Sequence, residues 1–180
     1  MKELSLNILD IAKNSVTAGA TLVEITVAET HDRLTITVRD NGCGMTPEFV
    51  ARVTDPFTTT RTTRKVGMGI PLLQMEAQMA GGDLAIASEV GKGTTVTAWF
   101  DPNNIDMPPL GDLTSSIVTL IQGSPDIDVL FIHQVEEAQY TLDTREIREI
   151  MGGISLAEPE ILGWLTDFLT ENESTLEGKR

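Results

Sequence analysis

Two hydrophobic periods alternate along the first hundred residues, and this alternation restricts the chain to folds that combine helices with a sheet. Residues 3–18 repeat apolar side chains at helical spacing, whereas residues 21–28 alternate apolar and polar side chains as half-buried strands do. The expected elements are a helix over 3–18, strands over 21–28 and 33–39, a short helix over 48–53, a loop over 54–67, a helix over 68–80, and strands over 83–89 and 94–100. This order predicts an α/β fold of the α+β two-layer sandwich type, with helices on one face of a mostly antiparallel sheet.

The charge is distributed unevenly and predicts a domain boundary. Residues 1–100 carry 9 basic and 11 acidic side chains, whereas residues 101–180 carry 4 and 16. We therefore predict a first domain over 1–101, a turn-rich linker over 102–110, and a small acidic α+β module over 111–180. The module's expected elements are a helix over 112–122, strands over 127–133 and 137–142, helices over 144–151 and 158–171, and a frayed tail from Glu171.

Composition also excludes several classes of function. A net charge of −14 argues against nucleic-acid binding, because phosphate contacts require many Lys and Arg side chains. No apolar run approaches the ~20 residues that a membrane span requires, and the first residues lack the pattern of a signal peptide. The one cysteine, Cys43, excludes an intrachain disulfide. We expect a cytoplasmic protein that contacts neither membrane nor nucleic acid.

The first candidate functional residues are the pair Asp10 and Asn14. The two are four residues apart on the predicted first helix, so both side chains project from one face. An amide oxygen is a neutral ligand for Mg²⁺, and a carboxylate can orient or deprotonate a water molecule. The alternative is an exposed polar face of an amphipathic helix.

Three glycine-containing segments follow in order. Asp40-Asn-Gly-Cys-Gly-Met45 ends a strand, where an Asp can accept a hydrogen bond from an adenine amino group and glycines permit close approach; a simple turn is the alternative. The stretch 55–69 is basic and has Gly67 and Gly69 at a helix start, where backbone N–H groups favour phosphate. Gly91-Lys-Gly-Thr-Thr95 is by itself only a hairpin signal.

Together these segments resemble the GHKL family of ATPases and kinases, which has the Bergerat fold, over about residues 3–100. The stretch from Asn7 through Asn14 resembles the family's N box, and Asp40 to Met45 its first glycine box. Asp55-Pro-Phe57 resembles the F box, Gly67-Met-Gly69-Ile70 the second glycine box, and Gly91 to Thr95 the third.

The resemblance implies a nucleotide site that holds ATP and Mg²⁺. Asn14 would coordinate Mg²⁺, Asp40 would bind the adenine amino group, Thr94 would support the adenine subsite, and Asp10 is the candidate catalytic residue. The remaining residues expected to contact the nucleotide are Gly42, Gly44, Met45, Phe57, Thr58, Lys65, Gly67, Met68, Gly69 and Ile70. Residues 55–69 would form the ATP lid.

Two departures from the family pattern bear on mechanism. The hydrolysing members usually have Glu where Asp10 stands, and Lys65 and Val66 replace the leading glycine of the second glycine box. The N box resembles that of MutL proteins, whereas Pro-Phe-Thr-Thr and the short lid resemble histidine kinases. The N box also begins almost at residue 1, so we expect no phosphoacceptor hairpin before it.

These features favour a kinase-like ATP-dependent regulator that transfers phosphate to a partner protein or acts with one. The alternative is a slow ATPase that works as a nucleotide-driven conformational or dimerisation switch. A dimerisation switch would form a homodimer. The acidic module predicts a protein partner that is basic or of mixed charge. His133 is interpreted as structural rather than as a phosphoacceptor, and Cys43 as a spacer. Trp164 is interpreted as a core residue, with a partner-binding face as the alternative.

Overall fold

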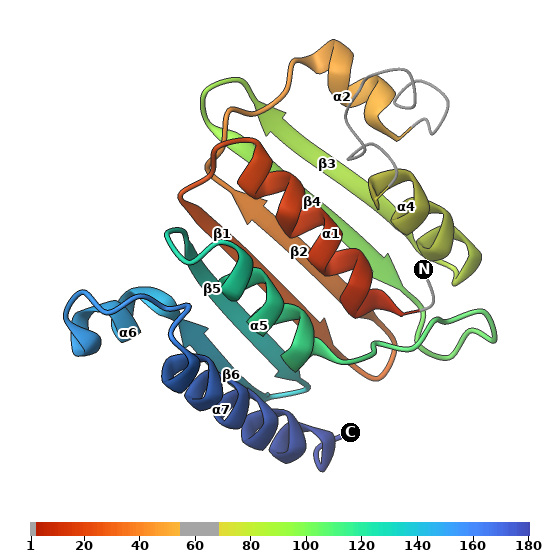
Figure 1. Cartoon of the computed structure of the whole chain (residues 1–180). Helices are drawn as coiled ribbons and strands as arrows, with labels where there is room; N and C mark the ends of the chain where they lie inside the picture. The colour runs from red at the N-terminus through yellow and green to blue at the C-terminus, as the bar shows by residue number, and fades with distance from the viewer. Residues whose placement is uncertain (1–2, 55–68) are drawn as a thin grey trace.

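The computed structural model describes residues 3–54 and 69–180, whose strands form one six-stranded sheet in the order β3-β4-β2-β1-β5-β6 (Figure 1). The strands are β1 (Leu22–Glu29), β2 (Leu34–Asp40), β3 (Asp83–Glu89), β4 (Gly93–Phe100), β5 (Asp128–Val135) and β6 (Ala138–Asp143). The helices are α1 (Leu4–Thr17), α2 (Pro47–Val53), α4 (Gly69–Met79), α5 (Leu113–Gly123), α6 (Thr144–Met151) and α7 (Pro159–Glu177). Neighbouring strands pair antiparallel except β1 and β5, which are parallel.

The helices α1, α4, α5 and α7 lie across one face of this sheet, which confirms the predicted two-layer architecture (Figure 1). The alternate residues of β1 that point toward these helices are buried, among them Val23, Ile25 and Val27. On the other face Thr26 pairs with Thr37, and these side chains are half-buried, as the period-two pattern predicts. Helix α1 buries the apolar stripe that its helical spacing predicts.

The sheet continues without a break across the boundary that the charge distribution predicts. Strand β5 pairs with β1 along its whole length, from Asp128 opposite Leu22 to Val135 opposite Glu29. Helix α5 packs between α1 and α7, and buried residues from both parts of the chain form one hydrophobic core. The predicted acidic module therefore extends the same sheet rather than forming a second sheet of its own.

The predicted linker is attached to the start of α1. The backbone N–H groups of Leu4 and Ser5 donate to the carbonyl oxygens of Pro109 and Leu110, at 3.0 and 2.8 Å. These bonds satisfy two of the N–H groups that lack partners at the beginning of a helix. Residues 109–110 thus connect the first helix directly to the segment that leads into α5.

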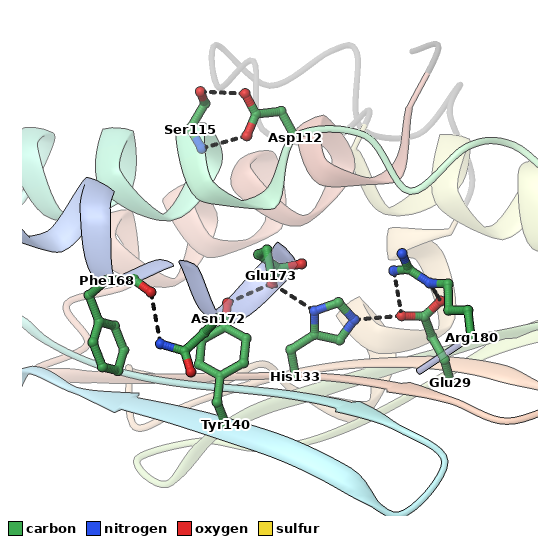
Figure 2. A network of polar contacts seen from close by, with 9 residues as sticks. All are labelled: Glu29, Asp112, Ser115, His133, Tyr140, Phe168, Asn172, Glu173 and Arg180. Atoms are coloured by element: carbon green, nitrogen blue, oxygen red, sulfur yellow. Dashed lines mark hydrogen bonds and ion pairs between the residues drawn. The ribbon is translucent and has the colours of Figure 1, made fainter. Parts of the chain in front are cut away.

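Helix α7 is longer than predicted and its end is ordered by side-chain contacts. The prediction of a frayed tail from Glu171 is wrong, because the helix continues to Glu177. Leu176 is 3% exposed and belongs to the core, and Glu173 accepts hydrogen bonds from Tyr140 at 2.5 Å and from His133 (Figure 2). Apolar burial and these bonds offset the chain entropy that would otherwise fray the terminus.

His133 has the structural role that was predicted. It lies within β5 with no exposed surface, and its two ring nitrogens contact Glu173 at 2.7 Å and Glu29 at 2.5 Å (Figure 2). Arg180 forms a two-pronged contact with Glu29, at 3.0 and 2.9 Å. These side chains connect α7 to the end of β1. Among the described residues, none of the helices has the length and apolar character that crossing a membrane requires.

Candidate functional site

The carboxylate of Asp40, at the end of β2, is held beside α1 by two hydrogen bonds. Its Oδ2 accepts from the Ser15 hydroxyl at 2.6 Å, and its Oδ1 accepts from the Gly42 backbone N–H at 2.8 Å. Ser15 is buried, whereas Asp40 is half-buried. A carboxylate offers about four acceptor positions, so Asp40 keeps capacity for a ligand's N–H while its own orientation is fixed.

The segment after Asp40 is attached on three sides. The Cys43 N–H donates to the carbonyl of Ala18 at 2.9 Å, and the Cys43 carbonyl accepts from the Gly91 N–H at 2.7 Å. The Asn41 side-chain oxygen accepts from two successive backbone N–H groups at the start of β1, at 2.8 and 3.0 Å. This loop is therefore rigidly placed between α1, β1 and the turn between β3 and β4.

Two of the glycines at this edge are required by close backbone contacts. Gly44 has a φ of +72°, and a Cβ there would lie 2.0 Å from the carbonyl oxygen of Glu89. Gly93 has a φ of +128°, and its Cβ would lie 2.0 Å from the carbonyl oxygen of Asp40. Neither position accommodates a side chain. The first and third glycine segments thus meet directly beside Asp40.

Thr94 lies opposite Asp40 in the pairing of β2 and β4. Its hydroxyl oxygen is 2.8 Å from that of Ser88, which also accepts from the Met45 N–H at 2.8 Å and donates to the Gly93 carbonyl at 3.0 Å. The structure therefore brings Asp40, Met45 and Thr94 together, although the sequence places them in separate segments.

The polar face of α1 meets the beginning of α4. Asp10 and Asn14 are both half-buried, and a Cβ added to Gly69 would lie 3.5 Å from the Cβ of Asp10 and 4.0 Å from Nδ2 of Asn14. The first turn of α4 therefore faces both side chains. The Ile70 side chain packs into the core at 6% exposure, so it supports this turn from inside. Gly42, which was expected to contact the nucleotide, is buried, and a Cβ there would lie 2.9 Å from the carbonyl oxygen of Ala18.

Part of the predicted site lies outside the described residues. This part comprises Phe57, Thr58, Lys65, Gly67 and Met68.

Three polar side chains at this edge were not predicted from the sequence. No role was predicted for the side chains of Ser15, Ser88 or Asn41. A hydroxyl on the buried face of a helix is a signal that could have identified Ser15, because a buried hydroxyl requires a partner. The spacing of Ser88 carries no comparable signal.

Residues 1–104 match the model of the family described as "Histidine kinase-, DNA gyrase B-, and HSP90-like ATPase". The chain belongs to this family. It therefore carries an ATP-binding, histidine kinase-like ATPase domain, and the mixed α/β sheet with helices on one face is consistent with the Bergerat ATPase fold. This assignment confirms the resemblance that the five boxes predict.

Several relatives of this ATPase-family chain are named as kinases. It is 32% identical over 97 residues to "Signal transduction histidine-protein kinase AtoS" of Escherichia coli (strain K12), covering 54% of this chain and 16% of that protein. It is 32% identical over 101 residues to "Histidine protein kinase DivJ" of Caulobacter vibrioides, covering 54% of this chain and 17% of that protein. The matched part thus spans about a sixth of the length of these relatives.

A solved structure shares the fold of this ATPase-family chain over most of its length. The "Crystal Structure of N terminal domain of a DNA repair protein" aligns with a TM-score of 0.57 at 16% identity. The alignment covers 85% of this chain and 58% of that chain. The fold likeness therefore extends well beyond the segment that the family model matches.

The described residues fit an adenine nucleotide. The acceptor capacity of Asp40 suits an exocyclic amino group, and the first turn of α4 begins at Gly69 beside Asp10 and Asn14. No cluster of three or more His, Cys, Asp or Glu side chains with metal-binding geometry occurs within residues 3–54 and 69–180. A magnesium ion that takes most of its oxygen ligands from phosphate and water does not require one.

A separate cavity lies away from this site. It has a volume of about 500 Å³, and Glu29, Leu34 and Arg180 are among its lining residues. Glu29 pairs with Leu34 at one end of the β1 and β2 ladder, whereas Asp40 pairs with Val23 at the other end. The cavity therefore contains none of the predicted nucleotide-contacting residues.

Proposed function

We propose that this chain binds Mg-ATP at the Asp40 edge of the sheet and acts as a kinase-like regulator that transfers phosphate to a partner protein or acts with one. The observation that carries the proposal is the carboxylate of Asp40, which Ser15 and the Gly42 N–H orient beside α1. The kinase part of the proposal is supported by the names of the relatives, which apply to those proteins.

Each residue of the site has a specific role in this proposal. Asp40 accepts a hydrogen bond from the adenine amino group, and Thr94 lies on the strand beside it. Asn14 would hold a magnesium ion through its amide oxygen, and the ion would neutralise phosphate charge. Asp10, on the same face of α1, orients the attacking group or accepts its proton. The N–H groups in the first turn of α4 stabilise phosphate oxygens.

The partner is expected to be a basic or mixed-charge protein. Residues 101–180 carry 16 acidic and 4 basic side chains, and several of the basic ones are already paired. Arg145 binds Asp143, Arg148 binds Asp128, and Arg180 binds Glu29. Exposed carboxylates on this part of the chain therefore favour a positively charged surface.

Isothermal titration calorimetry with Mg-ATP tests the nucleotide site. Asp40→Asn keeps the shape of the side chain but replaces one acceptor oxygen with a donor, so it should weaken binding by at least about tenfold. Asp32→Asn is the matched control, because Asp32 is exposed in the turn after β1. Equal affinities for Asp40→Asn and the unaltered chain would remove Asp40 from the site.

Phosphate transfer needs a second assay. Incubation of the purified chain with γ-labelled ATP and an extract of its source should label a discrete protein, and the Asp40→Asn variant should not label it. ATP binding without any transferred label would contradict the kinase part of the proposal.

A nucleotide-driven switch is the second candidate, and the contact between α1 and the later part of the chain favours it. The start of α1 is bonded to residues 109–110, and α5 packs on α1, so movement of this helix would reach α7. In this candidate Asp10→Asn abolishes slow ATP turnover and leaves ATP binding intact. Unchanged turnover in Asp10→Asn would exclude Asp10 from hydrolysis.

A further inference from the structure

Helices α1 and α4 contact each other at two points that belong to one antiparallel register. Near one end, Asn7 Nδ2 donates a hydrogen bond of 2.5 Å to Glu76 Oε2. Near the other, Gly69 faces Asp10 and Asn14. Gly69 and Glu76 are seven positions apart on α4, and Asn7 is three positions from Asp10 and seven from Asn14 on α1. The two contacts are therefore about 10 Å apart along α4 and about 5–10 Å apart along α1, given a rise of about 1.5 Å per residue.

Asn7 is an unusual residue for its surroundings. Its side chain has no exposed surface, and neighbouring positions on α1 such as Leu4, Ile8 and Ile11 belong to the core. Among the residues that the structure describes, no group donates to its Oδ1. An orphaned amide oxygen in the interior is unfavourable, and a leucine of similar shape would avoid this cost. Packing alone does not explain an asparagine here.

Glu76 provides the second half of the contact. Its carboxyl group is partly buried, and this burial raises its pKa although the hydrogen bond from Asn7 acts in the opposite direction. The bond joins α1 to a helix whose other buried side chains are apolar, among them Leu73 and Ala77 of α4. Apolar contacts are non-directional, whereas a hydrogen bond specifies one alignment.

We propose that Asn7 is a positioning residue: its bond to Glu76 sets the axial register of α4 on α1 and thereby holds the first turn of α4 beside Asp10 and Asn14. The inference rests on the proposed Mg-ATP site, because the register matters through the phosphate-binding turn. A buried asparagine fixes the register of helix pairs in coiled coils by the same physical means. A slip of one helical turn would move that turn by about 5.4 Å.

Two variants separate positioning from packing. Glu76→Gln keeps an acceptor oxygen for Asn7 Nδ2, and its amide N–H can also donate to Asn7 Oδ1. The double variant Asn7→Leu/Glu76→Met replaces both polar groups of this hydrogen bond with apolar groups of similar shape, so neither side of the bond is left unsatisfied. Thermal unfolding and calorimetry with Mg-ATP are measured on each protein.

Positioning predicts that stability and affinity change independently. Glu76→Gln should bind Mg-ATP as the unaltered chain does. The double variant should unfold at the same or a higher temperature. It should nevertheless bind Mg-ATP about tenfold more weakly. A tenfold change in affinity corresponds to about 1.4 kcal/mol, which is near the upper end of the free energy that one hydrogen bond contributes. Unchanged affinity in the double variant would overturn the inference.

The outcome stays decisive if the double variant does not fold. The single variant Glu76→Met then replaces it, and positioning requires weaker binding in Glu76→Met than in Glu76→Gln; equal affinities in these two variants overturn the inference. Failure of the proposed function looks different, because the unaltered chain itself would then not bind Mg-ATP.

Discussion

Replacement of His133 by leucine should destabilise the fold in a pH-dependent manner. The imidazole is fully buried in β5, and both ring nitrogens contact carboxylates, those of Glu173 on α7 and Glu29 on β1 (Figure 2). A neutral imidazole has one N–H and can donate to only one of them. Both bonds are satisfied together when His133 carries a positive charge between two negative ones.

The direction of the pKa shifts determines the pH range in which the contacts of His133 stabilise the fold. Burial by itself would lower the pKa of His133, but the hydrogen bonds and charges of Glu173 and Glu29 outweigh it and raise the pKa above 6.5. A raised histidine pKa contributes stability that is fully present below about pH 6.5 and is lost as the pH rises through the folded-state value. The pKa of Glu29 is lowered from 4.5 because the bonds from His133 and Arg180 outweigh its burial, so that contribution is lost in acid.

The expected loss of stability in His133→Leu follows from the burial of its partners, Glu29 and Glu173. Loss of one partner from a buried ion pair costs about 3–5 kcal/mol. The Glu29 and Glu173 side chains are 20% and 22% exposed, and Arg180 and Tyr140 would remain beside them. We therefore expect the lower end, about 3 kcal/mol, or a fall in Tm of roughly 6–12 °C for a chain of this length.

Urea unfolding at about pH 6 and about pH 9 measures this effect. His133→Leu should lose more stability at the lower pH, where the imidazolium is present in the unaltered chain. His31→Leu is the matched control, since His31 is exposed in a turn and is the chain's other histidine. A loss for His133→Leu that is the same at both pH values, or as small as that of His31→Leu, would refute the reasoning.

Three further substitutions test other contacts. Gly93→Ala places a Cβ 2.0 Å from the Asp40 carbonyl oxygen and should lower the free energy of unfolding by more than about 2 kcal/mol. The control Gly91→Ala, where a Cβ would have no atom within 4 Å, should lower it by about 1 kcal/mol. Equal losses in thermal unfolding would contradict the close contact at Gly93. Ser15→Ala removes one donor to Asp40 and should weaken Mg-ATP binding about fivefold by calorimetry, whereas Thr17→Ala, on the exposed side of α1, should not. Leu176→Ala should cost about 2–4 kcal/mol in urea unfolding because Leu176 is 3% exposed, and a loss below about 0.5 kcal/mol would indicate a frayed tail after all.

The sequence determined the local elements and the identity of the family. Apolar side chains at helical or strand spacing predicted the position of each helix and strand to within a few residues, except for the C-terminal end of α7, because burial of one face requires that period. The order of the five boxes identified the nucleotide-binding family. It also placed Asp40 at a strand end, where the structure holds it between α1 and the glycine-containing loop. Each element and each box is local, because it depends on side chains that lie close together in the chain.

The tertiary structure alone decided how distant segments meet. The parallel pairing of β5 with β1 joined the acidic part of the chain to the ATP-binding sheet, and backbone hydrogen bonds of this kind leave no signature in the side chains. The Ser15 bond to Asp40, the Asn7 bond to Glu76 and the contacts of His133 likewise join residues far apart in the sequence. Such contacts are selected by the geometry of packed elements, and no residue period or local propensity encodes which partner a buried polar group will find.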